Sequence, residues 1–200
     1  MASLLTSLEN NWGLTALLIN MNNYKELNLN FPVFRDDFVF PKECPNYHVT
    51  IKIDVEKSLH PELIQFFKDL GLNIKAMIFR TPPHNKCSIH IDGFATHQQW
   101  GINWVWGDDH LMSWWKPYSS KISLDNFQKT NAKTPYLFWG DDDVTLLESV
   151  KITKPVIIKT GVPHRVENFS DSDRWCLTVR PIVPSNWDVA LKTFKEYIIE

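Results

Sequence analysis

The chain has 200 residues, which is enough to bury a sizeable core in one domain. Hydrophobic residues make up 44% of the sequence and charged residues 22%, proportions that are typical of globular proteins and exclude a disordered or fibrous chain. The 21 basic and 23 acidic residues are interspersed and give a net charge of −2, so a broad basic surface for nucleic acid is not expected.

The cysteine content and the hydropathy of the chain indicate the cellular compartment in which it is expected. Cys44, Cys87 and Cys176 are too few for a disulfide framework and form no CxxC pair, which favours a reducing, cytoplasmic location. Residues 1–20 are apolar in part, but polar residues interrupt them and no basic start or cleavage site is present, so we expect an amphipathic helix there. No other run approaches the roughly 20 apolar residues of a membrane span, and no membrane association is expected.

The first part of the chain mixes helix and strand signals. Residues 47–54 alternate valine and isoleucine with polar residues, which predicts a strand with one buried face. A short helix is predicted to follow at His60, because apolar residues recur there at helical spacing until Gly71 supplies a stop. We expect that helix to pack on a sheet.

From residue 73 onward, short apolar or alternating runs are separated by turn residues. We expect strands at 74–80, 88–92, 101–106, 136–139, 144–147, 155–159, 162–166 and 175–180. Many short strands at this spacing indicate a β-sandwich or a β-barrel. The polar residues 116–134 are predicted to form a long loop. A last helix is predicted with Ser185 as its N-cap and an apolar stripe that begins at Trp187.

Nine tryptophans, six of them between Trp100 and Trp139, are the unusual feature of the composition. Aromatic residues at this density are typical of a core built from strands, and the alternative is a stacking surface for a ligand. For residues 112–117, which contain two of the tryptophans, we expect packing against the N-terminal helices; coverage of a pocket mouth is the alternative.

The sequence Ser88-Ile89-His90-Ile91-Asp92-Gly93 contains the first candidate for chemistry. In a strand, side chains alternate, so His90 and Asp92 lie on one face and can point at the same metal ion. A histidine followed two places later by aspartate is, however, expected by chance in about every second chain of this composition. The pair therefore needs support from elsewhere in the chain.

That support comes from residues 154–181. An apolar strand ends at Gly161, His164 follows in a second strand, and Arg174 begins a third. Two histidines and one carboxylate, with His90 and Asp92 close together in sequence and His164 distant, make the facial triad of non-haem Fe(II) oxygenases, which leaves coordination sites open. Cys87 and His90 have Cys-x-x-His spacing, but no second pair completes a structural zinc site.

These motifs resemble those of the Fe(II)- and 2-oxoglutarate-dependent dioxygenases, in order and direction, over residues 74–181. The resemblance implies an α+β protein with a mainly β core, a double-stranded β-helix of the jelly-roll, cupin-like type. It also implies Fe(II), 2-oxoglutarate and O2 as cofactor and co-substrates. By the same resemblance His90, Asp92 and His164 would hold the metal, and Arg174 would bind the 5-carboxylate of 2-oxoglutarate. Many members have Ser or Thr two places after that arginine, where this chain has Cys176.

Strand parity adds two candidates to the co-substrate site. Arg174, Cys176 and Arg180 share one face of their strand, so Arg180 is the second candidate for the carboxylate anchor. A polar cavity explains two arginines on this face, and a solvated sheet edge is the alternative. Asn103 is a polar residue in a predicted strand and a candidate hydrogen-bond partner of the 2-oxo acid or the substrate; an edge position is the alternative.

We therefore expect a single domain over 1–200, with an N-terminal region at 1–72, the double-stranded β-helix at 73–181 and a C-terminal helix at 182–200. The expected activity is hydroxylation of an organic substrate, either a small molecule or a peptide side chain. Two alternatives remain open at this point: a cupin-like metalloenzyme that does not use 2-oxoglutarate, and a non-catalytic binding or structural module of the same fold.

Overall fold

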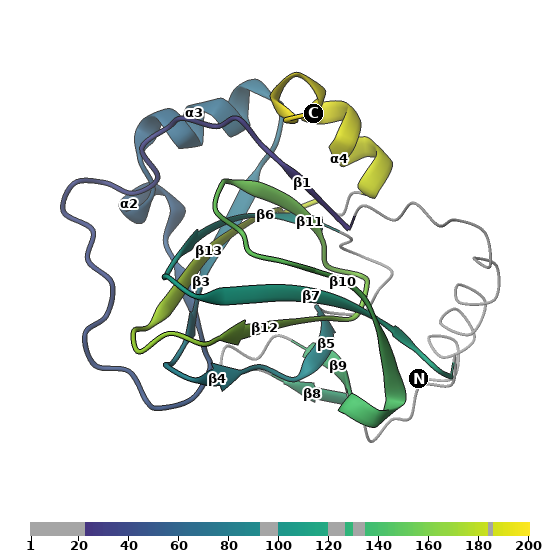
Figure 1. Ribbon diagram of the computed structural model, residues 1–200. Helices are drawn as coiled ribbons and strands as arrows, with labels where there is room; N and C mark the ends of the chain where they lie inside the picture. Colours follow the sequence, from purple (N-terminus) through teal and green to yellow (C-terminus); the bar gives the residue numbers. More distant parts are fainter. Residues whose placement is uncertain (1–22, 93–99, 120–126, 130–134, 184–185) are drawn as a thin grey trace.

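The computed structural model describes residues 23–92, 100–119, 127–129, 135–183 and 186–200, which form two antiparallel sheets with helices beside them (Figure 1). The first sheet has the order β1 (Tyr24–Glu26), β11 (Val156–Lys159), β6 (Trp100–Trp106), β13 (Arg174–Pro181), β3 (Ile74–Thr81) and β2 (Val49–Ile53). The second has the order β10 (Val144–Val150), β7 (His110–Pro117), β12 (His164–Asn168), β5 (Ile89–Asp92), β9 (Pro135–Trp139) and β8 (Phe127–Lys129). The short strand β4 (Asn85–Lys86) pairs with β12.

The strand order shows how the two halves of the chain are wound together. Strands β3, β5, β6 and β7 follow one another in the first half, and β10, β11, β12 and β13 in the second. Each pairs antiparallel with one strand of the other half: β3 with β13, β5 with β12, β6 with β11, and β7 with β10. A chain folded back on itself and coiled in this way is a double-stranded β-helix, or jelly roll, as the family resemblance implies.

Helices cover the outer face of the first sheet. α2 (Val55–Ser58) leads into α3 (Pro61–Asp69), where the His60 side chain accepts a hydrogen bond from the Glu62 amide and Gly71 has a φ of +70°. Both ends of α3 therefore match the prediction. Its buried residues pack with the outward side chains of β3, β6 and β13 and with Phe194, which follows α4 (Trp187–Thr193). Two 3-10 turns complete the described elements. η2 (Asp141–Asp143) lies between β9 and β10, and η3 (Lys195–Tyr197) follows α4.

Each predicted strand is present, with ends displaced by at most three residues, but two other predictions were wrong or incomplete. Residues 112–117 were expected to pack against the N-terminal helices; within the described residues they belong to β7, and Met112 and Trp114 pack with Ile152, Val156 and Ile158. The loop expected at 116–134 contains the end of β7 and all of β8; residues 120–126 and 130–134 lie outside the described part of the chain.

Two predictions concern the two ends of the chain. The N-cap of α4 is Asn186, whose side chain accepts a hydrogen bond from the Val189 amide. The expected cap Ser185 lies outside the described residues, and so does the amphipathic helix expected at 1–20. No helix in the described segments is long and apolar enough to cross a bilayer.

Trp114 illustrates how the tryptophan-rich region builds the space between the sheets. Its side chain is fully buried, its ring stacks on Tyr24 with centroids 5.6 Å apart, and its Nε1–H donates to the Lys159 carbonyl at 3.2 Å. Tyr24 lies on β1 and Lys159 on β11, so this one side chain of the second sheet contacts two strands of the first. The expectation that tryptophans form the core of the strands is confirmed here.

We expect Trp114→Ala to lower the free energy of unfolding by about 3–5 kcal/mol, because it leaves a cavity and an unsatisfied carbonyl. Urea denaturation followed by circular dichroism measures the change. Leu146→Ala is the control: Leu146 is 51% exposed, so its removal is expected to change stability by no more than about 0.5 kcal/mol. A loss below about 1 kcal/mol for Trp114→Ala would contradict the role assigned to this side chain.

Candidate metal centre

The second sheet brings three potential metal ligands together. His90 and Asp92 project from one face of β5, whereas Ile89 and Ile91 are fully buried on the other. His164 is the first residue of β12 and pairs directly with His90 in the strand register. The alternation predicted for 88–92 is therefore confirmed, and the strand pairing adds the distant histidine.

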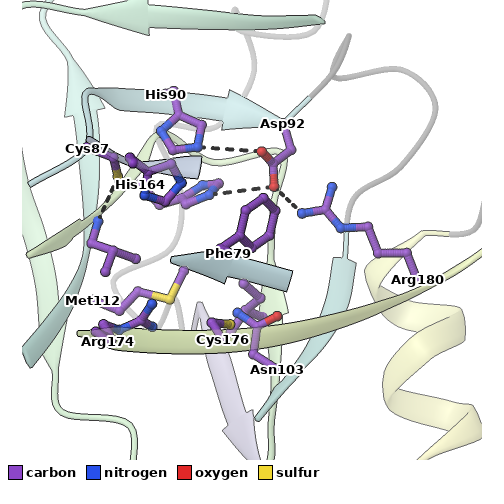
Figure 2. A pocket seen from close by; sticks show the side chains of 13 residues that line it. Phe79, Cys87, His90, Asp92, Asn103, Met112, His164, Arg174, Cys176 and Arg180 are labelled. Atoms are coloured by element: carbon purple, nitrogen blue, oxygen red, sulfur yellow. Dashed lines mark hydrogen bonds and ion pairs between the residues drawn. The ribbon is translucent and has the colours of Figure 1, made fainter. Parts of the chain in front are cut away.

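The three side chains converge on one point (Figure 2). Nε2 of His90 lies 3.5 Å from Oδ1 of Asp92, and Nε2 of His164 lies 3.8 Å from Oδ2. One potential ligand atom from each residue lies within 4.8 Å of the others. This spacing suits a single ion with three protein ligands; the ligand role itself stays a prediction.

Hydrogen bonds to the backbone fix the orientation of both imidazoles. Nδ1 of His90 lies 2.7 Å from the Ser88 carbonyl, and Nδ1 of His164 lies 2.9 Å from the Val162 carbonyl. A carbonyl oxygen only accepts, so Nδ1 carries the proton in each ring and donates it. Nε2 is therefore the nitrogen that faces the centre, and its lone pair is available to a metal when the ring is neutral.

The charges of the centre are coupled. Burial would raise the pKa of Asp92, but the positive Arg180, followed by His90 and His164, holds it well below its usual range. Burial would lower the pKa of His90, but hydrogen bonds to Asp92 and Cys87 raise it well above the usual value. Burial, and then the charge of His90, lowers the pKa of His164 to about 4. The carboxylate is thus ionised and one imidazole is neutral at pH 7.

Arg180 reaches the centre from the first sheet. Its Nη2 donates to Oδ2 of Asp92, and both side chains are almost completely buried. Figure 2 shows this arginine at one end of β13 and Arg174 at the other, with Phe79 between them and the histidines. Arg180 is therefore committed to Asp92, and Arg174 is the arginine that remains for another anion.

Arg174 is the exceptional charge in this cavity. Its side chain is 1% exposed, and neither Nε nor Nη2 has a hydrogen-bond partner among the described residues. Burial lowers the pKa of its guanidinium, although arginine stays charged in proteins. A buried charge with two unbonded donors is costly when no anion lies beside it.

The strand-parity prediction is confirmed by the placement of these residues. Arg174, Cys176 and Arg180 line the cavity, whereas Trp175, Leu177 and Val179 pack in the core beneath the helices. The solvated-edge alternative is wrong, because β13 lies between β6 and β3.

Asn103 also lines the cavity from an interior strand. β6 lies between β11 and β13, so the edge-strand alternative for this asparagine is wrong as well. Its side chain is 6% exposed, and its Oδ1 accepts no hydrogen bond from the described residues. This Oδ1 is available to accept a hydrogen bond in the same cavity.

The sequence did not identify several residues of the cavity wall. They are His48, Phe79, Cys87, Met112, Ile158 and Val166. His48 precedes β2, and its Nδ1 lies 3.2 Å from the Thr81 hydroxyl; burial, then the charges of His90 and Arg174, lower its pKa to about 4. Parity within the predicted strand at 47–54 places His48 on one face with Thr50, but the sequence did not show which sheet face encloses the cavity.

Comparisons with known proteins add little to this geometry. No protein-family model and no curated protein matches the sequence. The solved vicilin from Solanum melongena is similar at 8% identity with a TM-score of 0.40, over 72% of this chain and 31% of that one. Oxalate decarboxylase from Bacillus subtilis, which has Mn(II) centres, is similar at 10% identity with a TM-score of 0.35, over 73% of this chain and 28% of that one.

The chain spans less than a third of the length of either relative. With TM-scores of 0.40 and 0.35, neither similarity supports an argument about this chain. The assignment of a jelly roll rests on the strand pairing described above, and no reaction follows from these relatives.

His110 gives this region a measurable pH dependence. It is 2% exposed, its Nε2–H donates to the Ile152 carbonyl at 3.1 Å, and burial together with the charge of Arg174 lowers its pKa to about 4. The folded protein therefore keeps His110 neutral at pH values where the unfolded chain binds a proton, so its contribution to stability is lost as the pH falls from about 6.5 towards 4.

We expect His110→Gln to remove the part of the pH dependence of stability that comes from protonation of His110. The free energy of unfolding should then fall less steeply between pH 6.5 and 4, by up to about 3 kcal/mol over the window. Urea denaturation at several pH values measures the slope. Leu146→Ala, which changes an exposed residue of β10 that does not titrate, is the control and should keep the original slope. Parallel curves for the wild type and His110→Gln would rule out a neutral buried imidazole.

Proposed function

We propose that the protein is an Fe(II)- and 2-oxoglutarate-dependent oxygenase that hydroxylates an organic substrate. The observation that carries the proposal is the presence, in one cavity, of a two-histidine, one-carboxylate triad and of Arg174, a buried arginine with two unbonded donors. A metal site alone fits many cupin-like proteins. The two unbonded donors of Arg174 add a place where an anion would bind beside the triad.

The donor set fits Fe(II). Two imidazole nitrogens and one carboxylate are the ligands found in non-haem Fe(II) oxygenases, and they leave three positions for other ligands. Because Arg180 donates to Oδ2 of Asp92, Oδ1 is the carboxylate oxygen available to a metal. The backbone hydrogen bonds of both histidines already direct Nε2 to the centre, so little reorganisation is needed for binding.

The other end of the cavity fits the distal carboxylate of a dicarboxylic 2-oxo acid. Nε and Nη2 of Arg174 are two donors of one planar fork, and a carboxylate accepts two parallel hydrogen bonds from such a fork. Phe79, Met112 and Ile158 supply apolar walls, which exclude water and strengthen this ion pair. The unbonded Oδ1 of Asn103 can accept a hydrogen bond from a donor group of the substrate.

When bound, the iron, the 2-oxo acid and O2 would supply the oxidation. The side chains of the protein would hold and orient these reactants. His90, Asp92 and His164 would hold the metal, Arg180 keeps Asp92 ionised and oriented, and Arg174 would orient the co-substrate. In such a division of labour no protein side chain has to transfer a proton to the substrate.

We expect His90→Ala, Asp92→Ala and His164→Ala each to lower 2-oxoglutarate-dependent succinate release at least about 100-fold, since each removes one of three ligands. Anaerobic calorimetry with Mn(II) in place of Fe(II) should show the same loss of metal affinity. His84→Ala is the control, because His84 is exposed and pairs with Asp171 outside the cavity. Full turnover in any of the three variants would remove that residue from the ligand set.

A second test addresses the co-substrate. Arg174→Met is expected to weaken anaerobic binding of 2-oxoglutarate about 30- to 150-fold while Mn(II) affinity is retained, because only the carboxylate anchor is lost. Arg35→Met serves as the control, since the Arg35 side chain donates to the Glu56 carbonyl and does not line the cavity. Metal binding without any 2-oxoglutarate binding in the wild type would instead indicate a cupin-like metalloenzyme of another kind. Absence of metal binding would indicate a non-catalytic module.

A further inference from the structure

A row of basic side chains borders the metal-ligand triad on the first sheet. Lys75 of β3 lies directly opposite Arg180 in the strand register, and Arg180 donates to Asp92. Lys52 of β2 lies opposite Met77, two residues along β3 from Lys75. Because side chains alternate along strands, all of these residues share one sheet face. Lys52, Lys75 and Arg180 are called the basic row below.

The basic row lies on the inner face of the sheet. Phe79 belongs to the same alternation as Lys75 and lines the cavity, whereas Ala76 and Ile78 pack in the core beneath the helices. On β2, His48 shares the face of Lys52 and also lines the cavity. Both lysines therefore extend the cavity face from its buried part to its exposed edge.

The positive charge of this row is only partly balanced. Asp92 neutralises Arg180, but neither Lys52 nor Lys75 forms an ion pair or hydrogen bond with the described residues. Partial burial, and then the charges of Arg180 and Lys52, lower the pKa of Lys75. Like charges on facing positions of a sheet are destabilising. An anionic ligand would relieve this repulsion, although the whole chain has a net charge of −2.

Aromatic side chains border the same triad on the second sheet. Tyr136 pairs with Asp92 and Phe138 with His90 across β5 and β9, so both face the centre. The Tyr136 ring lies edge-on to His90 with centroids 5.7 Å apart, and its hydroxyl donates to Oε1 of Gln128 at 2.6 Å. Both rings are half-buried and leave part of their surface accessible beside the triad.

We propose that the substrate is an organic anion with a flat apolar body, whose carboxylate or phosphate group binds Lys52 and Lys75 while its ring packs against Tyr136 and Phe138. This inference rests on the proposed function and names the substrate class of that site. Arg180 of the basic row donates to Asp92 from the first sheet, and Tyr136 lies beside Asp92 on the second sheet. A molecule that contacts both the basic row and the two aromatic rings therefore places its carbon skeleton beside the triad. Lysine recognises anions as a point charge, which admits either kind of acid group.

The test compares matched charged and neutral probes. Phenylacetate, phenyl phosphate and phenylacetamide are titrated into the full chain, first without added metal and then with Zn(II) and 2-oxoglutarate, and affinity is read by ligand-observed NMR. We expect at least one anion to bind about tenfold more tightly than the amide, as charge-assisted hydrogen bonds imply. In the double variant K52Q/K75Q this preference should fall to within about twofold.

Two controls separate charge from packing. K57Q/K68Q removes the same charge from exposed lysines of α2 and α3 and should keep the preference for the anion. Tyr136→Leu should weaken all three probes alike, because it removes ring surface and no charge. Equal affinities for the anions and the amide in the wild type, absence of binding by every probe at millimolar concentration, or an unchanged preference in K52Q/K75Q would overturn the proposal.

Failure of the oxygenase proposal has a different signature. It appears as absent metal binding or absent succinate release, whereas the charge preference is measured already without metal. A protein that turns over 2-oxoglutarate but ignores probe charge would refute the substrate class alone.

Discussion

The ion pair between Arg180 and Asp92 is the contact on which the centre depends. It joins β13 of the first sheet to β5 of the second at the place where His90 and His164 meet. Without it, the Asp92 carboxylate would lose the positive charge that lowers its pKa most, and breaking one half of a buried pair costs several kcal/mol. The pair therefore sets the ionisation of Asp92 and the relative position of the two sheets.

Strand β13 combines two opposite electrostatic conditions. At one end Arg180 is neutralised within the protein, and at the other end Arg174 is buried with its Nε and Nη2 unbonded among the described residues. The strand can carry both because its other face is locked into the core by Trp175, Leu177 and Val179, and because β3 and β6 flank it on either side. Stability provided by that face offsets the cost of the unsatisfied charge, which is then available for binding.

Much of the fold was accessible from the sequence because its signals are local. Alternation placed His90 and Asp92 on one face, and the same rule put Arg174 and Arg180 on one wall of the cavity. The direct pairing of His164 with His90 is a matter of register between strands far apart in the chain, which no local pattern encodes. Likewise, β7 was misjudged at residues 112–117, because a run rich in tryptophan has no polar alternation to reveal its strand period.

The contribution of the N-terminal region to the site was also not predictable. His48 reaches the cavity only because β2 extends the first sheet beyond β3. Which arginine is committed to Asp92 depends on where each end of β13 lies relative to the other sheet. Parity treats Arg174 and Arg180 alike, and only the three-dimensional arrangement distinguishes them.

The backbone hydrogen bonds of His90 and His164 have an evolutionary consequence. Each imidazole is oriented by a carbonyl group two residues earlier in its own strand segment, so the orientation of these two candidate metal ligands needs no other side chain. Mutations in the surrounding wall, including the basic row and the aromatic residues Tyr136 and Phe138, can then accumulate without turning the histidines away from the centre. Changes in that wall could then alter ligand binding in small steps while both imidazoles keep their orientation.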